Sequence, residues 1–221
     1  MDRRHPPRTS QESFMTLHPP SSDTPETSPA GLVRRGRLAE LRQHQPADRE
    51  DFMRWYQDPD IAELLRHNLE PLTSAQARGY FDSIVLPSSA RGTAWAIHDR
   101  VSGNLIGSTA VTEIDQAAGT CLFRIVIGEK QAWGHGFGTD ATRLVVAEAF
   151  ETLNLRVVKL EVFEHNLRAR RAYERVGFRE TGRQFEWVPR RRRRLNVIAM
   201  QLDRATWRDG DTAPDTTRPL A

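Results

Sequence analysis

The sequence has few of the features that stabilise secreted proteins or anchor membrane proteins. Its 221 residues include a single cysteine, Cys121, so an internal disulfide framework is excluded. No apolar run approaches the length of a membrane span, and the basic N-terminus lacks the apolar segment of a secretory signal. We therefore expect a cytoplasmic protein with no membrane partner, in which Cys121 is a small core residue.

Two stretches have few of the large apolar residues that a core needs. Residues 1–33 and 205–221 are rich in proline, serine or threonine instead. We expect a disordered N-terminal tail and a flexible C-terminal tail. The remainder, 34–204, is long enough for one domain with a sizeable core.

Positive charge comes almost entirely from arginine, and the formal net charge is only +3. Such a mild excess favours anionic ligands without identifying a nucleic-acid partner. The run Arg190–Arg194 lies at an expected turn between two strands. A solvated basic turn explains this run, and attraction of an acidic peptide, a phosphorylated small molecule or ribosomal RNA is the alternative. No recognised nucleic-acid-binding module is present.

The best-defined pattern lies between Phe123 and Asp140. The β-branched run 123–127 predicts a buried strand, glycines at 134, 136 and 138 predict a turn, and apolar residues at helical spacing follow. A glycine loop that enters a helix presents unpaired N–H groups and the positive end of the helix dipole. The pattern therefore predicts a phosphate-binding loop, with an ordinary glycine turn as the simpler alternative.

Two common phosphate-binding motifs do not fit this loop. A Walker loop requires a lysine directly after a glycine, and the dinucleotide fingerprint requires a glycine at position 139, where the chain has Thr139. The spacing that is present reads Gln131-x-x-Gly134-x-Gly136. The ligand is therefore expected to be a phosphate compound of another class.

The rest of the chain predicts helices first and then a mainly antiparallel sheet. Helices are expected over 46–56, 61–65 and 73–84, the last ending before Leu86-Pro87. A helix between strands 121–127 and 157–163 makes these strands parallel, and ligands bind at the carboxyl ends of such strands. A final helix is expected from Asn166, near its N-cap, to Gly177. The other expected strands are 38–41, 93–98, 105–112, 181–187 and 194–202.

Two segments resemble the GCN5-related N-acetyltransferase (GNAT) family. The spacing Gln131-x-x-Gly134-x-Gly136 is similar to the acetyl-CoA pyrophosphate loop of that family, and Asn166-x-x-Ala169-x-x-Ala172-Tyr173-x-x-x-Gly177-Phe178 is similar to a second family segment. Three further stretches look most like the RimJ/RimL branch: Trp55-x-x-Asp58-Pro59, the residues 133–141, and Asn196-Val197-Ile198-x-Met200. The resemblance covers about 37–202.

The resemblance implies the α+β GNAT fold. We expect a mixed, mostly antiparallel twisted sheet of about six or seven strands, with a central splayed parallel pair and about four flanking helices. It also implies an acetyl-CoA-dependent N-acetyltransferase, in which an amine attacks the thioester directly in a ternary complex.

Acetyl-CoA is then the donor substrate, no metal is required, and the acceptor is a protein N-terminal amine or a small-molecule amine. A ribosomal protein as partner and a homodimer are compatible with the branch. Two alternatives stay open. One is a CoA-binding regulatory protein without turnover, and the other is an RNA- or ribosome-binding module that uses Arg190–Arg194.

The resemblance also assigns roles to residues. Tyr173 matches the family tyrosine that protonates the leaving thiolate, with packing on the sheet as its alternative role. Asn166 matches a residue that contacts CoA, and Arg168 and Arg171 lie near the helix start that meets the phosphates, unless they are solvated. The residues implied to bind the coenzyme are Ile125, Val126, Ile127, Gln131, Trp133, Gly134, His135, Gly136, Phe137, Gly138, Thr139, Asn166 and Arg171.

The general base is not assigned by the resemblance. Relatives often carry glutamate on the central strand, but the corresponding position holds Leu122, and Arg124 replaces a small residue. Glu113 is the first substitute, ahead of His135 and Glu161, and each can equally be a surface side chain. A weak base favours an α-amine, whose pKa is near 8, over a lysine near 10.4, and water can then suffice as base.

Overall fold

The computed structural model describes residues 31–65 and 69–207. The tails expected at 1–33 and 205–221 therefore lie almost wholly outside the described residues. β1 begins at Leu32, two residues before the expected start of the domain. None of the described helices is long and apolar enough to cross a membrane.

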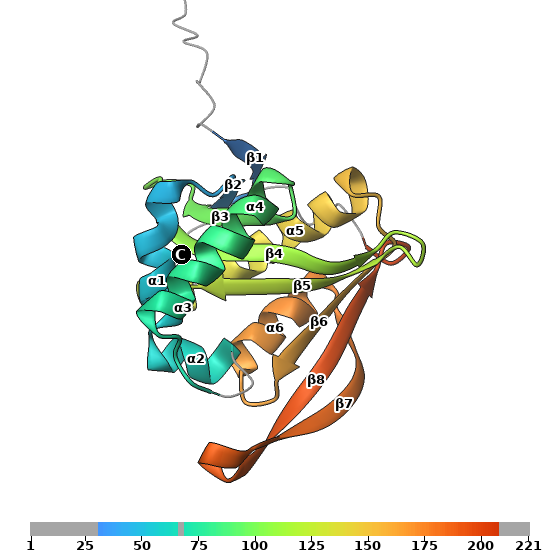
Figure 1. Cartoon of the computed structure of the whole chain (residues 1–221). Coiled ribbons are helices and arrows are strands. Elements are labelled where there is room, and N and C mark those ends of the chain that lie inside the picture. The colour runs from blue at the N-terminus through green and yellow to red at the C-terminus, as the bar shows by residue number, and fades with distance from the viewer. Residues whose placement is uncertain (1–30, 66–68, 208–221) are drawn as a thin grey trace, which may run out of the picture.

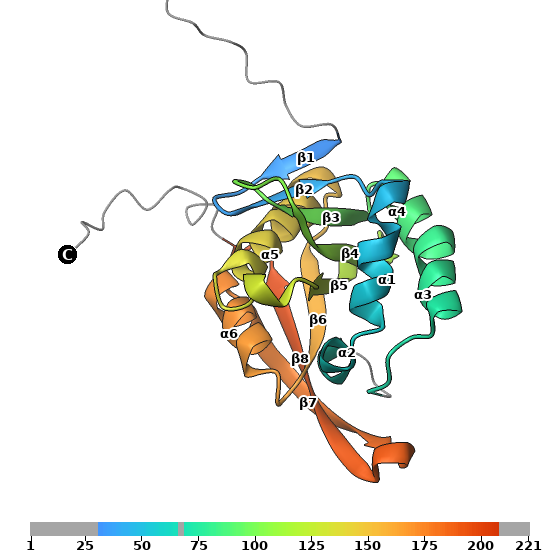
Figure 2. The same ribbon diagram turned by 90° about the vertical axis from the view of Figure 1, so that its left-hand side faces the viewer.

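In the described part of the chain, eight strands form one sheet in the order β1-β2-β3-β4-β5-β6-β8-β7, with β5 and β6 as its parallel pair. Figure 2 shows α1, α3 and α4 on one side of this sheet and α5 and α6 on the other. The strands are β1 (Leu32–Arg35), β2 (Ala39–Arg42), β3 (Ala94–Asp99), β4 (Leu105–Asp115), β5 (Thr120–Ile127), β6 (Val157–Phe163), β7 (Arg179–Val188) and β8 (Arg193–Asp203). The α-helices are α1 (Arg49–Tyr56), α2 (Pro59–Leu65), α3 (Ser74–Tyr80), α4 (Leu86–Ala90), α5 (Phe137–Ala147) and α6 (Leu167–Val176).

The mixed, helix-flanked sheet expected from the resemblance is confirmed, but it has one strand more than the expected range. The additional strand is β1, which pairs antiparallel with β2. Its sequence, Leu-Val-Arg-Arg, is too short and too charged to show an alternating pattern. Its position depends on tertiary contacts, because Arg34 donates to Glu148 at 2.6 Å and to Glu151 at 2.7 Å, just after α5.

The third expected helix does not end before Leu86-Pro87, which is a further correction. α3 continues through a π-helical segment, Phe81–Val85, into α4, which ends at Ala90. The Leu86 N–H donates to the Phe81 carbonyl, five residues back, and Pro87 follows in the first turn of α4. Proline is tolerated there because the first turn needs no N–H from it. This break divides one expected helix into α3 and α4, so the described residues form six α-helices instead of about four.

The parallel pair diverges, as expected. β5 and β6 pair at Thr120↔Val157, Cys121↔Val158 and Leu122↔Lys159, and their described residues make no ladder pairs beyond that point. Each strand runs several residues further, to Ile127 and to Phe163. Figure 1 shows the two strands separating toward the end of the sheet that α1 and α2 approach. An open edge therefore lies at the carboxyl ends of both strands.

The core that fixes this opening lies between the sheet and the α5–α6 pair. Cys121, Phe123 and Val158 contribute to it from the strands, and Val145 and Phe150 contribute from α5 and the turn after it. Cys121 is buried, which confirms it as a core residue, and burial raises the pKa of its thiol to about 11. α5 is also fastened by Asp140, whose carboxylate accepts from the amides of Leu38 at 2.8 Å and Ala39 at 2.9 Å.

Candidate active site

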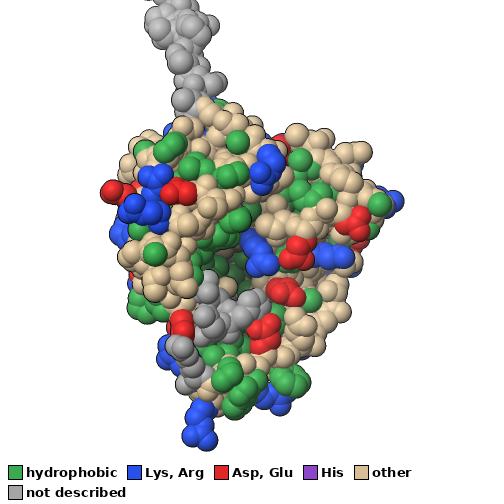
Figure 3. All heavy atoms as spheres, in the orientation of Figure 1, with side chains coloured by type: hydrophobic (Ala, Val, Ile, Leu, Met, Phe, Trp, Pro, Cys, Tyr) green, Lys and Arg blue, Asp and Glu red, His purple; other side chains and the backbone are tan. Residues whose placement is uncertain are grey.

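A cavity of about 550 Å³ occupies the opening between β5 and β6. Figure 3 shows this face of the molecule hollowed near its centre, with hydrophobic side chains in the recess. The cavity is bounded by the glycine loop, by both strands, by α6, and by side chains of α1, α2 and α3. Of the residues expected at the site, the cavity is lined by Ile125, Val126, Ile127, Trp133, Gly134, Gly136, Gly138, Thr139, Asn166 and Tyr173.

The structure does not bring every expected site residue to this cavity. Gln131 donates to Glu129 at 3.1 Å, His135 and Arg171 are exposed, and Phe137 packs against the core. None of these four lines the cavity within the described part of the chain. Any contact they make with a coenzyme would therefore occur at the outer edge of the site.

Glu113 also lies outside the cavity wall that the described residues form. Its side chain is 71% exposed, its φ angle is +50°, and its carboxylate lies 3.6 Å from the Arg124 guanidinium. The strand β4 has a register irregularity between Thr112 and Asp115, which displaces Glu113 from the regular alternation of faces. The structure therefore gives no support to Glu113 as the general base.

The glycine loop has the geometry that its sequence predicts. Gly134 and Gly136 adopt φ angles of +85° and +91°, a conformation that is costly for residues with a Cβ atom, and Gly136 is the N-cap of α5. The Trp133 indole N–H donates to the Ile127 carbonyl at 2.7 Å, and the Arg168 guanidinium lies over the Trp133 ring at 3.8 Å. A loop fixed in this way directs the N-terminus of α5 at the mouth of the cavity.

The free edge of β5 can be assigned from its pairing with β4. The Gly128 N–H donates to the Ile106 carbonyl at 2.9 Å, and residues of an antiparallel ladder alternate between facing the partner strand and facing away. The backbone groups of Phe123, Ile125 and Ile127 therefore face β6, whereas those of Val126 face β4. The last bridge between the two strands, Leu122↔Lys159, uses the Phe123 N–H, and the strands diverge beyond it, so the Ile125 amide is available to an extended ligand.

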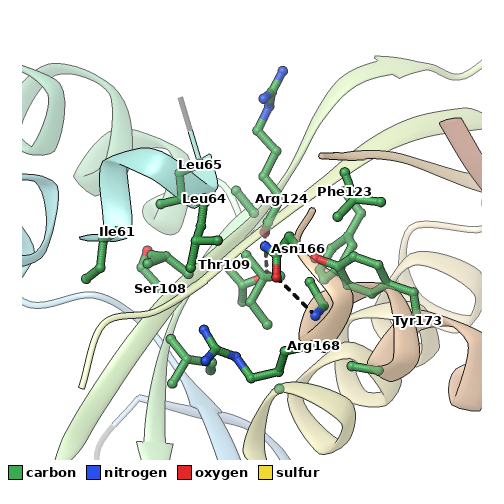
Figure 4. A pocket seen from close by; sticks show the side chains of 18 of the residues that line it. Ile61, Leu64, Leu65, Ser108, Thr109, Phe123, Arg124, Asn166, Arg168 and Tyr173 are labelled. Atoms are coloured by element: carbon green, nitrogen blue, oxygen red, sulfur yellow. Dashed lines mark hydrogen bonds between the residues drawn. The ribbon is translucent and has the colours of Figure 1, made fainter. Parts of the chain in front are cut away.

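Tyr173 lies on α6 with its side chain buried at the cavity wall. Its ring packs edge-on against Phe123, with 6.1 Å between ring centroids, and is tilted against Phe178, with 6.0 Å between centroids. Burial raises the pKa of the phenol above its ordinary value, so Tyr173 stays protonated at neutral pH. Asn166 caps the same helix by accepting from the Ala169 N–H at 3.2 Å, and Figure 4 shows both side chains on one wall.

The opposite end of the cavity is apolar. It is lined by Phe52 and Tyr56 of α1, Ile61 and Leu64 of α2, and Tyr80 of α3. Figure 4 shows Ile61, Leu64 and Ser108 across the cavity from Tyr173. An apolar chamber thus faces the buried phenol.

Few charged groups line the cavity. Among the described residues they are Arg124, Arg168, Arg175 and Glu161. Leu122 also lines the cavity, at the position where relatives often carry a glutamate that acts as general base. The Glu161 carboxylate accepts a hydrogen bond from the Gln184 side chain at 3.0 Å. The described residues contain no cluster of histidine, cysteine and acidic side chains that could hold a metal ion.

The join between α1 and the end of β5 is not expected from the sequence. The Glu129 carboxylate accepts from the Trp55 indole at 2.8 Å and from Arg54 at 2.6 Å, which holds the pKa of Glu129 below its ordinary range although burial opposes this. A Cβ atom at Gly128 would overlap the Trp55 ring. The only local signal is the Trp55-x-x-Asp58-Pro59 pattern, in which Asp58 pairs with Lys130 at 2.7 Å.

Comparison with known proteins agrees with this geometry. Residues 39–179 match the sequence model of the acetyltransferase (GNAT) domain. An uncharacterized N-acetyltransferase of Bacillus licheniformis, p20, is 23% identical over 164 residues, which cover 73% of this chain and 90% of that protein.

Solved structures share the fold. A spermidine N-acetyltransferase from Vibrio cholerae, crystallised with CoA and spermine, matches with a TM-score of 0.65 and 22% identity over 76% of this chain and 96% of that one. A GCN5-related N-acetyltransferase from Brucella melitensis matches with a TM-score of 0.62 and 22% identity over 81% of each chain. The family expected from the two sequence segments is confirmed, and the chain is an acyltransferase enzyme that belongs to the GNAT acetyltransferase family.

Proposed function

We propose that the protein transfers an acetyl group from acetyl-CoA to the α-amine of a protein N-terminus or to a small amine of low pKa, as in the RimJ/RimL branch. One observation carries the proposal: a single cavity connects the glycine loop, the open edge of β5, Tyr173 and the apolar chamber. A phosphate-bearing, extended thioester fits the first two parts, and an amine fits the last.

Different residues along this cavity would bind the diphosphate, orient the thioester and protonate the leaving sulfur. Loop amides near Gly134 and Gly136 would hold the diphosphate, with Arg168 beside them. The backbone of Ile125 would pair with the extended arm and orient the thioester carbonyl. Attack by the amine forms the C–N bond and breaks the C–S bond, and Tyr173 would give its proton to the departing sulfur.

The charge of the cavity favours an acceptor that is not a polycation. Three arginines and one glutamate line it among the described residues, and the glutamate is already bound by Gln184. A polyamine carries several positive charges at neutral pH, and among the described residues Glu161 is the one carboxylate that the cavity wall offers to them. The Vibrio cholerae relative acts on spermidine by its name, so a different acceptor class is proposed for this chain.

Two measurements on the full chain test the proposal. Calorimetry is expected to show binding of CoA. Release of free thiol from acetyl-CoA is expected with peptides that have a free N-terminus or with weakly basic amines, and to be slower with spermidine. Absence of CoA binding by a folded sample would contradict the proposal, and fastest turnover with spermidine would contradict the acceptor class.

A CoA-binding protein without turnover is the second candidate, and Leu122 favours it because this position of β5 supplies no carboxylate to the cavity. It predicts CoA binding with no thiol release for any amine tested. The RNA-binding alternative has less support. Arg191 and Arg193 are already paired with Glu63 at 3.2 and 2.7 Å, and Arg194 stacks on Phe185.

A further inference from the structure

Three polar residues from distant parts of the chain meet beneath the apolar chamber. His44 follows β2, Asp48 lies in the 3-10 turn before α1, and Ser108 lies on β4. His44 Nδ1 is 3.1 Å from Asp48 Oδ2, and His44 Nε2 is 2.9 Å from Ser108 Oγ. The His44 side chain is 0% exposed, and Ser108 lines the cavity. A hydrogen-bonded chain therefore runs from the cavity wall to a carboxylate near the surface.

The direction of each hydrogen bond follows from Asp48. Its carboxylate also accepts from the Gln45 N–H at 2.9 Å. Burial opposes ionisation of Asp48, but the hydrogen bonds from His44 and Gln45 keep its pKa below the ordinary value, so it acts as an acceptor. His44 must then carry its proton on Nδ1, which leaves Nε2 as an acceptor for the Ser108 hydroxyl proton. The lone pairs of Ser108 Oγ remain for a donor in the cavity.

The packing around His44 holds this orientation. The Ser89 hydroxyl accepts from the His44 backbone N–H at 2.8 Å, and the imidazole stands edge-on to Phe81 at 5.7 Å between centroids. A histidine that serves only to fill the core does not need a ring nitrogen hydrogen-bonded to a residue of the cavity wall. Here both ring nitrogens are committed, one to a carboxylate and one to a hydroxyl at the cavity wall.

We propose that Ser108, His44 and Asp48 form the proton relay that deprotonates the acceptor amine. This inference rests on the function proposed above. As the C–N bond forms and the C–S bond breaks, the amine proton passes to Ser108 Oγ, directly or through one water, while the Ser108 proton passes to His44 Nε2. The imidazolium is stabilised by Asp48, and Tyr173 supplies the separate proton that the thiolate needs. The imidazolium later returns its proton to solvent along the same path.

The relay supplies the base that the sequence did not identify. Leu122 has no titratable group, Glu113 lies outside the cavity, and Glu161 is engaged by Gln184. Ser108 lies on β4, paired with Val126 of β5, and its side chain lines the cavity.

The relay requires a free lone pair on His44 Nε2 before reaction, so kcat should fall at acidic pH, where a proton occupies that position. The charged or titratable groups around His44, among the described residues, are Asp48, His98 on β3, and the paired Arg42 and Glu40 on β2. Because His98, Arg42 and Glu40 lie off the relay path, changing Ser108 leaves them in place.

The test compares Ser108→Ala and Asp48→Asn with Ser89→Ala as matched control. Ser89 is also buried and hydrogen-bonds to His44, but only to its backbone. We expect Ser108→Ala to lower kcat by about 10²- to 10⁴-fold with little change in CoA affinity, and to remove the acidic limb of the kcat profile. The loss should be largest for acceptor amines of high pKa. Ser108→Thr, which keeps the hydroxyl, should restore part of the rate, and Ser89→Ala should keep the acidic limb.

Several outcomes would overturn the relay. The relay would be refuted if Ser108→Ala had the kcat of the wild type and kept the acidic limb of the kcat profile. It would also be refuted if kcat fell equally for all amines, because that indicates a structural role. Acetylation of Ser108 detected by mass spectrometry would identify a nucleophile instead. If Ser108→Ala does not fold, Asp48→Asn gives the same comparison from the partly exposed end of the chain. No turnover by the wild type with any amine would refute the proposed function itself, and the relay with it.

Discussion

At the scale of single residues, burial shifts the pKa of a side chain, and the position of the side chain decides what that shift does. Tyr173 and Cys121 are both buried, and burial raises the pKa of each. The two residues nevertheless differ in position, because Tyr173 borders the cavity and Cys121 belongs to the core. A protonated phenol at a cavity wall is a proton donor, whereas a protonated thiol in a core is inert.

Replacing Tyr173 by phenylalanine should separate chemistry from folding. The ring packing against Phe123 and Phe178 is kept, and no described residue hydrogen-bonds to the phenol, so stability should change little. We expect turnover to fall by about 10²- to 10⁴-fold while calorimetry shows nearly unchanged CoA binding. Since burial raises the phenol pKa, wild-type kcat should show no alkaline loss from Tyr173 near pH 10. Unchanged turnover in the variant would remove Tyr173 from this role.

Cys121 should resist thiol reagents in the folded protein. With its pKa raised to about 11 and its side chain buried, very little thiolate is present or accessible at neutral pH. Reaction with a disulfide reagent, followed by absorbance, is expected only after unfolding in denaturant. Rapid reaction of the native protein would mean that β5 opens far more readily than its packing indicates.

At the scale of elements, the site depends on how α1 is held against the end of β5. Trp55 packs over Gly128 and donates to Glu129, so a strand end and a helix share one small contact. The two neighbouring pairs, Arg54 with Glu129 and Lys130 with Asp58, reinforce it from the surface. This contact places the apolar residues of α1 above the divergence of β5 and β6.

Gly128→Ala should therefore destabilise the fold. The added methyl group would overlap the Trp55 indole, and overpacking of this kind costs about 1–3 kcal/mol. Gly182 is the control, because an added Cβ there meets nothing within 4 Å. Denaturation by guanidinium chloride should show the loss for Gly128→Ala and a change within about 0.5 kcal/mol for Gly182→Ala. Equal stabilities of the two variants would show that α1 moves aside at little cost.

At the scale of the whole molecule, the last hairpin reaches back to the helices that cover the chamber. Figures 1 and 2 show β7 and β8 extending together beyond the rest of the sheet. Near the end of this hairpin, Arg191 and Arg193 both pair with Glu63 of α2. Leu64 and Ile61 of the same helix line the cavity, so the hairpin helps to position the chamber wall.

Glu63→Gln should affect the acceptor and not the coenzyme. The pair is partly exposed, so its loss is worth at most about 1 kcal/mol, which limits the rise in acceptor KM to about fivefold. Binding of CoA should be unchanged because the diphosphate loop lies on other elements. Glu151→Gln is the control, since Glu151 also pairs with an arginine but lies after α5. A loss of CoA affinity in Glu63→Gln would contradict this division of the cavity.

The sequence by itself determined the parts of this protein whose structure is local. Glycines 134 and 136 adopt positive φ angles, Asn166 caps α6, and β-branched runs form the central parallel pair, because these choices depend on neighbouring residues. Tyr173 lies in the helix that was expected between Asn166 and Gly177. These features were enough to identify the family before any tertiary contact was known.

Tertiary structure alone decided the features that join distant residues. β1 forms because Arg34 meets acidic residues more than a hundred positions away, and Glu113 leaves the site because of an irregularity in β4. Ser108 and His44 are 64 positions apart, and they meet only because the segment after β2 folds against β4. Backbone conformation responds to local sequence, but the convergence of side chains depends on strand register and on packing across the sheet.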